Sequence, residues 1–413
     1  MDMTFKNAKI KSCVRAISSK SEAHRALICA ALADEPCFIF CRDTNDDINA
    51  TVSCLCALGA NIQRLDDGFL VSPIQSVAQN AELCVGESGS TLRFLLPVAA
   101  ALSAHCSFLM CGRLSQRPIL PIHNLLTSKG VSLSPVGSNP VSLKGKLSCG
   151  DYCIAADVSS QYISGLLIAL SVCRGTSTLT LSGKVESEPY ISMTLDTLTA
   201  FGADISFDKS TSTYTVNGRD RLVSPSTVSV GGDWSCAAPI LCAGAIGKNA
   251  VTVRGLELDS SQGDRQIIDI LGRMGARIEW IEDKVTVYPS RLCGIKLDAR
   301  DIPDLVPAIC VAAAVAQGKT EIFGASRLRF KESDRLQTTC DVLSALGADI
   351  TPTSDGMIIC GKSRLLGGEV DSFSDHRIAM CAAIASLVCD GEVTVRGFEA
   401  ISKSYPDFLQ NFE

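Results

Sequence analysis

Six long apolar segments recur along the chain, and each begins at a serine or an aspartate. Alanine, leucine, isoleucine and cysteine occupy nearly every face of these segments, which predicts helices that are buried on all sides. Ser and Asp favour helix starts because their side chains accept hydrogen bonds from the first free backbone N–H groups. The predicted starts lie roughly 70 residues apart, at Ser21, Ser90, Ser160, Asp233, Asp304 and Asp375.

A second repeated pattern, Leu-x-x-x-Gly-Ala, is offset from the first. It predicts a helix that ends at a glycine of positive φ and is followed by an extended segment. The glycines are again roughly 70 residues apart and are Gly59, Gly130, Gly202, Gly275 and Gly347. Together the two patterns indicate six copies of a unit that has two helices and several strands.

The ends of the chain are predicted to complete the sixth copy. Its glycine would fall beyond the last residue, so we expect the N-terminal strand 3–10 to join the short C-terminal helix 405–412. A Ser, Pro and Gly cluster at 225–232 predicts the boundary between two halves. We therefore predict an α/β (α+β) chain of two pseudo-threefold domains joined by two crossovers. Residues 13–230 form the N-terminal three-repeat domain, and residues 1–12 plus 231–413 form the C-terminal one.

Composition excludes several classes of function. The net charge of −6 argues against bulk binding to nucleic acid or membrane surfaces, which requires a broad basic face. The 20 cysteines show no zinc-ligand spacing and lie mostly in apolar runs, so we interpret them as small core residues of a cytoplasmic protein. We expect neither a signal peptide nor a membrane span.

The predicted helix starts differ between the two halves. Small or hydroxylated residues stand at the first three, and a helix N-terminus of that kind can bind an anion. Aspartates stand at the other three, which suits capping and proton transfer. The segment 86–91 superficially resembles a phosphate-binding loop, but it lacks the lysine and the glycine spacing of a nucleotide site.

The segment 327–335 has the most unusual charge pattern in the chain. It places Glu332 among Lys331 and Arg335, and a carboxylate flanked by cations is a candidate proton shuttle. The alternative is a solvated helix start capped by Ser333 or Asp334. Arg117 and Lys403 are further cations in loop-like contexts.

The residues at these positions form an ordered set of motifs, and by them the chain resembles the EPSP synthase family. The match extends from about residue 8 to residue 410. The motifs are Ser19-Lys-Ser-Glu-Ala-His-Arg25, Gly86–Arg93, Gln116-Arg-Pro118, Ser159-Ser-Gln161, Arg329-Phe-Lys-Glu-Ser-Asp-Arg335, Asp375-His-Arg377 and Lys403-Ser-Tyr-Pro-Asp407. The resemblance implies two domains, each of three βαβαββ repeats with buried parallel helices, of the inside-out α/β barrel type.

The resemblance also implies an activity in the shikimate pathway of aromatic amino-acid and chorismate biosynthesis. The 5-hydroxyl of shikimate 3-phosphate attacks C2 of phosphoenolpyruvate, and a tetrahedral intermediate then expels phosphate. The implied acceptor-binding residues are Lys20, Ser21, Arg25, Ser159, Ser160, Gln161, Ser187, Asp304 and Lys331. The implied donor-binding residues are Lys20, Gly89, Arg117, Gln161, Arg335, Arg377 and Lys403.

Catalysis is implied for Asp304, Glu332 and Lys20, without a metal or an organic cofactor. The two substrates bring roughly −5 to −6 of charge, and seven cations of the motifs can balance it. By the resemblance the protein is a glyphosate target, and we expect a monomer. Glu87 and Phe94 depart from the family pattern beside the donor loop, where by the resemblance we expect a change in glyphosate sensitivity whose direction the sequence does not fix. Arg327 stands where the family often has an acceptor-binding Asn.

Two other functions compete with this one. A transferase acting on UDP-N-acetylglucosamine shares the donor, but it has Asn after the first Lys and a reactive loop cysteine before Arg-Pro. Here Ser21 follows Lys20, and Cys111 does not lie in the matching motif. The other rival is a non-catalytic repeat scaffold or solenoid that binds an anion. The presence of Asp304, Glu332 and Lys20 argues against it.

Overall fold

The computed structural model describes residues 1–413, which divide into two compact units. The N-terminal unit contains Ser18–Val230, and the C-terminal unit contains Met1–Ile17 together with Gly231–Glu413. No helix of the chain combines the length and the apolar character that a membrane crossing requires.

The N-terminal unit contains six α-helices and twelve strands. Its helices are α1 (Lys20–Ala31), α2 (Asp46–Leu58), α3 (Gly89–Ala101), α4 (Leu120–Ser128), α5 (Ser160–Ser171) and α6 (Glu188–Ala200). Its strands are β3 (Cys37–Phe40), β4 (Asn61–Leu65), β5 (Gly68–Ser72), β6 (Ala81–Gly86), β7 (Cys106–Met110), β8 (Ser132–Leu133), β9 (Val141–Lys144), β10 (Asp151–Ala155), β11 (Gly175–Ser182), β12 (Asp204–Asp208), β13 (Thr213–Gly218) and β14 (Thr227–Ser229).

The C-terminal unit contains the same kinds of element, with five α-helices and eleven strands. Its helices are α7 (Trp234–Ile246), α8 (Ile267–Arg273), α9 (Val306–Ala314), α10 (Arg335–Ala345) and α11 (His376–Ala385), with 3₁₀ turns that include η2 (Gly263–Gln266), η3 (Pro303–Leu305), η4 (Ser326–Phe330) and η6 (Phe398–Lys403). Its strands are β1 (Met3–Phe5), β2 (Cys13–Arg15), β15 (Val251–Arg254), β16 (Arg277–Ile281), β17 (Lys284–Tyr288), β18 (Lys296–Asp298), β19 (Lys319–Phe323), β20 (Asp349–Pro352), β21 (Met357–Cys360), β22 (Gly368–Asp371) and β23 (Val393–Arg396).

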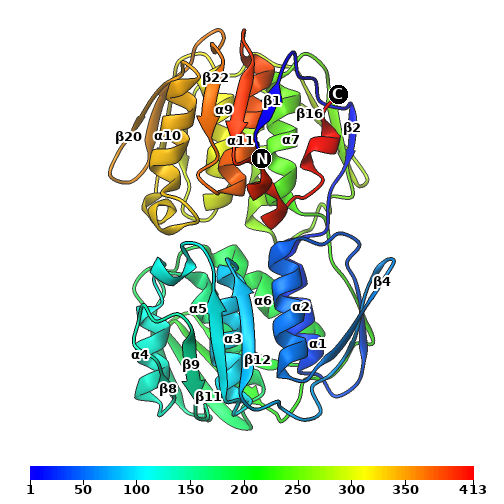
Figure 1. Cartoon of the computed structure of the whole chain (residues 1–413), viewed down its shortest axis with the longest axis vertical. Helices are drawn as coiled ribbons and strands as arrows, with labels where there is room; N and C mark the ends of the chain where they lie inside the picture. The colour runs from blue at the N-terminus through cyan, green and yellow to red at the C-terminus, as the bar shows by residue number, and fades with distance from the viewer. The chain divides into compact units, whose positions relative to one another are not determined.

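Each unit contains three small mixed sheets around three buried helices. The sheet orders are β14-β3-β5-β4, β6-β7-β9-β8 and β10-β11-β13-β12 in the N-terminal unit, and β2-β15-β17-β16, β18-β19-β21-β20 and β22-β23-β1 in the C-terminal unit. Helices α1, α3 and α5 are buried along most of their length, as are α7, α9 and α11. Helices α7, α9 and α11 contact one another and can be followed in Figure 1. Helices inside and sheets outside confirm the predicted fold class.

Two strands belong to a different unit from the helix that follows them. Strand β2 precedes α1 in sequence but pairs with β15, and β14 precedes α7 but pairs with β3. The chain crosses from one unit to the other just after β2 and just after β14, which gives the two predicted crossovers. The predicted boundary at residue 13 therefore differs from the observed one after Ile17, because residues 13–15 complete a sheet of the C-terminal unit.

The chain ends meet in the C-terminal unit. Strand β1 pairs antiparallel with β23, so the blue N-terminal strand of Figure 1 lies against the red end of the chain. Ile10 forms an isolated bridge with Phe412. The predicted pairing of the two ends is confirmed, but within 405–412, where a short α-helix was predicted, the chain forms a 3₁₀ turn at Phe408–Asn411.

The five repeat glycines all adopt positive φ, between 69° at Gly202 and 114° at Gly59. A side chain disfavours this conformation, so the helix-ending role predicted for them is confirmed. The predicted helix starts require small corrections. The N-caps in the N-terminal unit are Ser19, Ser88 and Ser159, one or two residues before the predicted Ser21, Ser90 and Ser160.

Asp304 is a larger correction. It lies in the 3₁₀ turn η3, and its carboxylate caps no backbone group of α9. Asp233 and Asp375 do cap α7 and α11, because each accepts a hydrogen bond from a backbone N–H of the first turn.

Candidate functional site

Lys20 begins α1 and forms an ion pair with Asp47 at the start of α2. The Lys20 Nζ lies 2.8 Å from Asp47 Oδ2, and the two side chains are 14% and 6% exposed. The sequence analysis identified Lys20 but missed its partner. The sequence feature that could have pointed to Asp47 is the acidic pair Asp46-Asp47 after the cap residue Asn45. On its own, that pair indicates only the start of a helix.

Arg25 lies one turn further along α1 and is almost fully buried. Its guanidinium donates to Thr194 Oγ1 at 2.7 Å, to the Ser21 carbonyl at 2.7 Å and to the Tyr190 carbonyl at 2.8 Å. These bonds hold α1 against α6.

A second group joins the starts of α3 and α5. Gln161 accepts from Arg93 Nη1 at 2.6 Å and donates to Ser90 Oγ at 2.8 Å. A Cβ at Gly89 would lie 3.0 Å from a terminal nitrogen of both Arg93 and Arg117, so glycine is what lets both guanidinium groups approach the helix start. Three predicted residues thus come together, with Arg93 as a member that the sequence analysis missed.

The predicted hydroxyl residues lie at the starts of α5 and α6. Ser159 caps α5 through Gln161 N, and Ser160 is buried behind it. Ser187 precedes α6 with a φ of 56°, a left-handed conformation that is uncommon for a residue other than glycine. Its side chain makes no cap bond to α6.

The C-terminal unit brings two carboxylates and four cations together at the starts of its buried helices. Asp304 Oδ1 lies 2.8 Å from Arg335 Nη1 and 3.3 Å from Lys331 Nζ, and its Oδ2 lies 3.5 Å from Arg377 Nη2. Glu332 pairs with Arg335 at 2.7 Å and with Lys403 at 3.7 Å. All six predicted residues of this unit therefore belong to one ionic cluster.

Charge controls the protonation of this cluster. Burial alone would raise the pKa of Asp304, but the cations Lys331, Arg377 and Arg335 together lower it well below its usual value. Burial would likewise lower the pKa of Arg335, yet Asp375 and the other carboxylates raise it above its usual value. The cluster is thus fully ionised at Asp304 and at Arg335.

Asp375 has a role that the sequence analysis did not foresee. It was predicted as a cap, which it is, but its Oδ2 also accepts from Arg335 Nε at 2.8 Å. Because the side chains of Asp375 and Arg335 are 0% and 1% exposed, this pair fixes the guanidinium in one orientation.

The residues that depart from the family pattern lie in different settings. Phe94 is buried in α3, where Arg25 stacks 5.0 Å from its ring centroid. The Glu87 carboxylate lies against Gly112, where a Cβ would approach it to 1.7 Å. Arg327 donates to the Arg300 carbonyl at 2.9 Å. Cys111 is exposed and follows β7.

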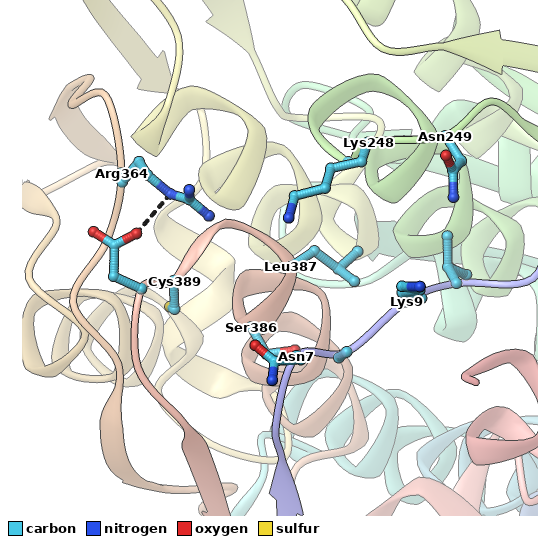
Figure 2. A pocket seen from close by; sticks show the side chains of 12 residues that line it. Asn7, Lys9, Lys248, Asn249, Arg364, Ser386, Leu387 and Cys389 are labelled. Atoms are coloured by element: carbon cyan, nitrogen blue, oxygen red, sulfur yellow. Dashed lines mark ion pairs between the residues drawn. The ribbon is translucent and has the colours of Figure 1, made fainter.

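A cavity of ≈ 390 Å³ lies elsewhere in the C-terminal unit, near the carboxyl ends of α7 and α11. Figure 2 shows Lys9, Lys248 and Leu387 around it, with Arg364 paired to Asp390. None of the predicted site residues lines it. The candidate functional groups are therefore the clusters at the helix starts of each unit, and not the residues of this cavity.

Comparison with known proteins gives a consistent family. A family model described as EPSP synthase (3-phosphoshikimate 1-carboxyvinyltransferase) matches residues 5–412. A 3-phosphoshikimate 1-carboxyvinyltransferase of Clostridium kluyveri is 38% identical over 98% of this chain and 95% of its own length. That of Clostridium perfringens strain ATCC 13124 is 38% identical over 98% and 96%.

Solved structures agree with the sequence relatives. The EPSP synthase of Acinetobacter baumannii has a TM-score of 0.81 and 28% identity, covering 100% of this chain and 98% of that one. The enolpyruvyl transferase NikO of Streptomyces tendae, at 20% identity and a TM-score of 0.79, shares the fold over 99% of this chain and 95% of that one. The whole-length family match and the 38% identity of the clostridial relatives show that this chain belongs to the EPSP synthase family.

Proposed function

We propose that this chain transfers the carboxyvinyl group of phosphoenolpyruvate to the 5-hydroxyl of shikimate 3-phosphate and releases phosphate. Membership of the family and the names of its relatives support this reaction. The observation that carries the proposal is Asp304, a carboxylate that is 21% exposed and has three cations within 3.5 Å. A second carboxylate, Glu332, lies in the same cluster.

The proposed chemistry needs three proton transfers, one from the acceptor hydroxyl, one onto C3 and one from C3, and no covalent enzyme intermediate. The acceptor oxygen bonds to C2 of the donor while its proton passes to Asp304 and C3 gains a proton. A tetrahedral intermediate forms. C3 then loses a proton, the C2–O bond to phosphate breaks, and the enol ether remains. Glu332 and Lys20 are assigned to the protons at C3, which suits general acid–base catalysis.

The cations of the C-terminal unit are assigned to the donor. Lys403, Arg335 and Arg377 offer guanidinium and ammonium groups that suit a phosphate and a carboxylate. An anion bound to them would draw positive charge away from Asp304. Its pKa would then rise toward its usual value, so Asp304 would become a better base when the donor is present.

The N-terminal unit is assigned mainly to the acceptor. Ser21, Ser159, Ser160 and Ser187 present hydroxyl groups near helix starts, which suits a phosphate. Further residues of this unit are assigned to one or both substrates, namely Lys20, Gly89, Arg25, Arg117 and Gln161. We further propose that the protein acts as a cytoplasmic monomer.

The assignment is tested by separating the two binding steps. Lys403→Met removes one charge-assisted contact, worth about 1.5–3 kcal/mol, so the KM for phosphoenolpyruvate should rise about 10- to 100-fold. The KM for shikimate 3-phosphate should change less than about threefold, whereas Ser160→Ala should affect mainly that KM. Lys284→Met, at an exposed lysine of β17, is the control. A Lys403→Met variant with unchanged KM for the donor would contradict the assignment.

A further inference from the structure

Asp264 is a buried carboxyl group that the proposed reaction does not use. It lies in η2, is 1% exposed, and accepts a hydrogen bond from Ser235 Oγ in the first turn of α7. Gln262 fixes the same segment. Its side chain accepts from Trp234 N at 3.0 Å and donates to the Gly232 carbonyl at 2.8 Å. Asp264 is therefore held rigidly at the start of α7.

The helix itself connects Asp264 to the ionic cluster. Pro239 lies inside α7 and has no N–H, so the carbonyl of Ser235 loses its usual helical partner. Arg377 takes that place, because its Nη1 donates to the Ser235 carbonyl at 2.6 Å. Its Nη2 lies 3.5 Å from Asp304. One residue, Ser235, thus contacts both Asp264 and the arginine that pairs with Asp304.

The carboxyl groups around these helix starts outnumber the permanent cations by one, and the imidazole of His376, whose Nδ1 lies 3.8 Å from Asp375 Oδ1, is a further titratable group there. The carboxyl groups number five and the cations four, which leaves a net charge of −1 when all are ionised and zero when one holds a proton. They are Asp233, Asp264, Asp304, Glu332 and Asp375, against Lys331, Arg335, Arg377 and Lys403.

Asp264 is the group best suited to hold that proton. Burial raises its pKa to about 7, and the negative charges of Asp304 and Asp233 act in the same direction. The hydrogen bond from Ser235 and the charge of Arg377 oppose the shift. Asp304, by contrast, is kept ionised by its three cations.

We propose that Asp264 is a positioning residue that takes up one proton from solvent when the anionic donor binds at Arg335 and Arg377. The donor brings negative charge beside Asp304. It also binds Arg377, so the positive charge of Arg377 stabilises the ionised form of Asp264 less. Protonation removes one negative charge from the buried cluster and leaves Ser235 and Arg377 in place. This inference rests on the donor site proposed above. It adds that binding of the donor is coupled to the uptake of one proton.

The experiment is the pH dependence of donor affinity in wild type and Asp264→Asn. A single linked proton weakens affinity by at most about tenfold per pH unit above the pKa of the free protein. From pH 7 to 8.5 the wild-type KM for phosphoenolpyruvate should rise at least about fivefold more than that of Asp264→Asn. The titration of the donor itself cancels in this comparison. The kcat of the two proteins should differ less than their KM at high pH.

Two further variants keep the test decisive. Asp259→Asn changes an exposed aspartate nearby and should retain the wild-type pH dependence. Ser235→Ala removes the bond that lowers the pKa of Asp264, so its loss of affinity should move to higher pH. Equal pH profiles for wild type and Asp264→Asn would overturn the proposal.

A binding measurement separates this inference from the proposed function. The rise in Tm that phosphoenolpyruvate causes needs no turnover, and it should fall with pH in wild type but much less in Asp264→Asn. An inactive wild-type protein that still shows this difference would overturn the proposed reaction and support the role of Asp264. An active enzyme in which the rise in Tm has the same pH dependence in both proteins would support the proposed reaction and overturn the role of Asp264.

Discussion

At the scale of single residues, the chemistry depends on how Asp304 is held. The three cations around it lower its pKa well below the usual value, so it stays ionised but is a weak base in the free protein. A bound anion would change that balance, which couples base strength to the presence of the donor. Charge at this one position should therefore matter more to turnover than to binding.

Asp304→Asn tests that expectation. The variant keeps the shape of the side chain but cannot accept the acceptor proton, so kcat should fall about 100-fold or more. The KM for each substrate should change modestly. Steady-state kinetics with both substrates varied provide the measurement, and Asp301→Asn, in the preceding loop, is the control. Near wild-type kcat in Asp304→Asn would remove Asp304 from the mechanism.

The residues that carry charge were predicted better than their partners. Lys20, Glu332 and Arg335 stand out in the sequence because cations and carboxylates gather at helix starts. Asp47 and Arg93 were missed, because their contacts form only when α1 packs on α2 and α3 on α5. Pairing between helices depends on packing geometry that a single segment does not contain.

At the scale of helices and strands, close packing of α3 and α5 positions the cluster of Gln161, Arg93 and Ser90 in the N-terminal unit. Pro97 in α3 has no N–H that could bond to the carbonyl of Arg93 one turn earlier. Gly165 of α5 lies against that carbonyl, where a Cβ would be 2.5 Å from the oxygen. The absence of a side chain at Gly165 is what brings Gln161 close to Arg93 and Ser90.

Gly165→Ala should therefore be destabilising. The added methyl group must push α5 away from the backbone of α3, and overpacking of this kind costs about 1–3 kcal/mol. Thermal or denaturant unfolding gives the measurement. Gly272→Ala in α8 is the matched control, because a Cβ there meets no atom within 4 Å and should be nearly neutral. Similar losses in both variants would contradict the role of this contact.

The sequence patterns predicted the ends of helices more accurately than their starts. The repeat glycines located the ends of helices well, because positive φ strongly favours glycine. The starts were misplaced by one or two residues where several serines stand together, since each can cap a helix. At Asp304 the pattern failed, because the first turn there is a 3₁₀ turn with its carboxylate directed to cations.

At the scale of the whole molecule, the repeats predicted the fold class, but the crossovers required the structure. The periodicity of helices and glycines indicated two threefold units. It did not reveal that β2 completes a sheet of the C-terminal unit and β14 a sheet of the N-terminal unit, since their partners β15 and β3 lie far away in sequence. Pairing with a strand so distant in sequence is a long-range contact, which local hydrophobic patterns do not encode.

The whole-chain account has one central claim, which is carboxyvinyl transfer between two named substrates. Its most direct test is phosphate release by the purified full-length protein, measured with shikimate 3-phosphate and phosphoenolpyruvate together and with each alone. The account predicts release only when both are present, with one carboxyvinyl ether formed per phosphate. No release with the pair, or equal release from phosphoenolpyruvate alone, would contradict it.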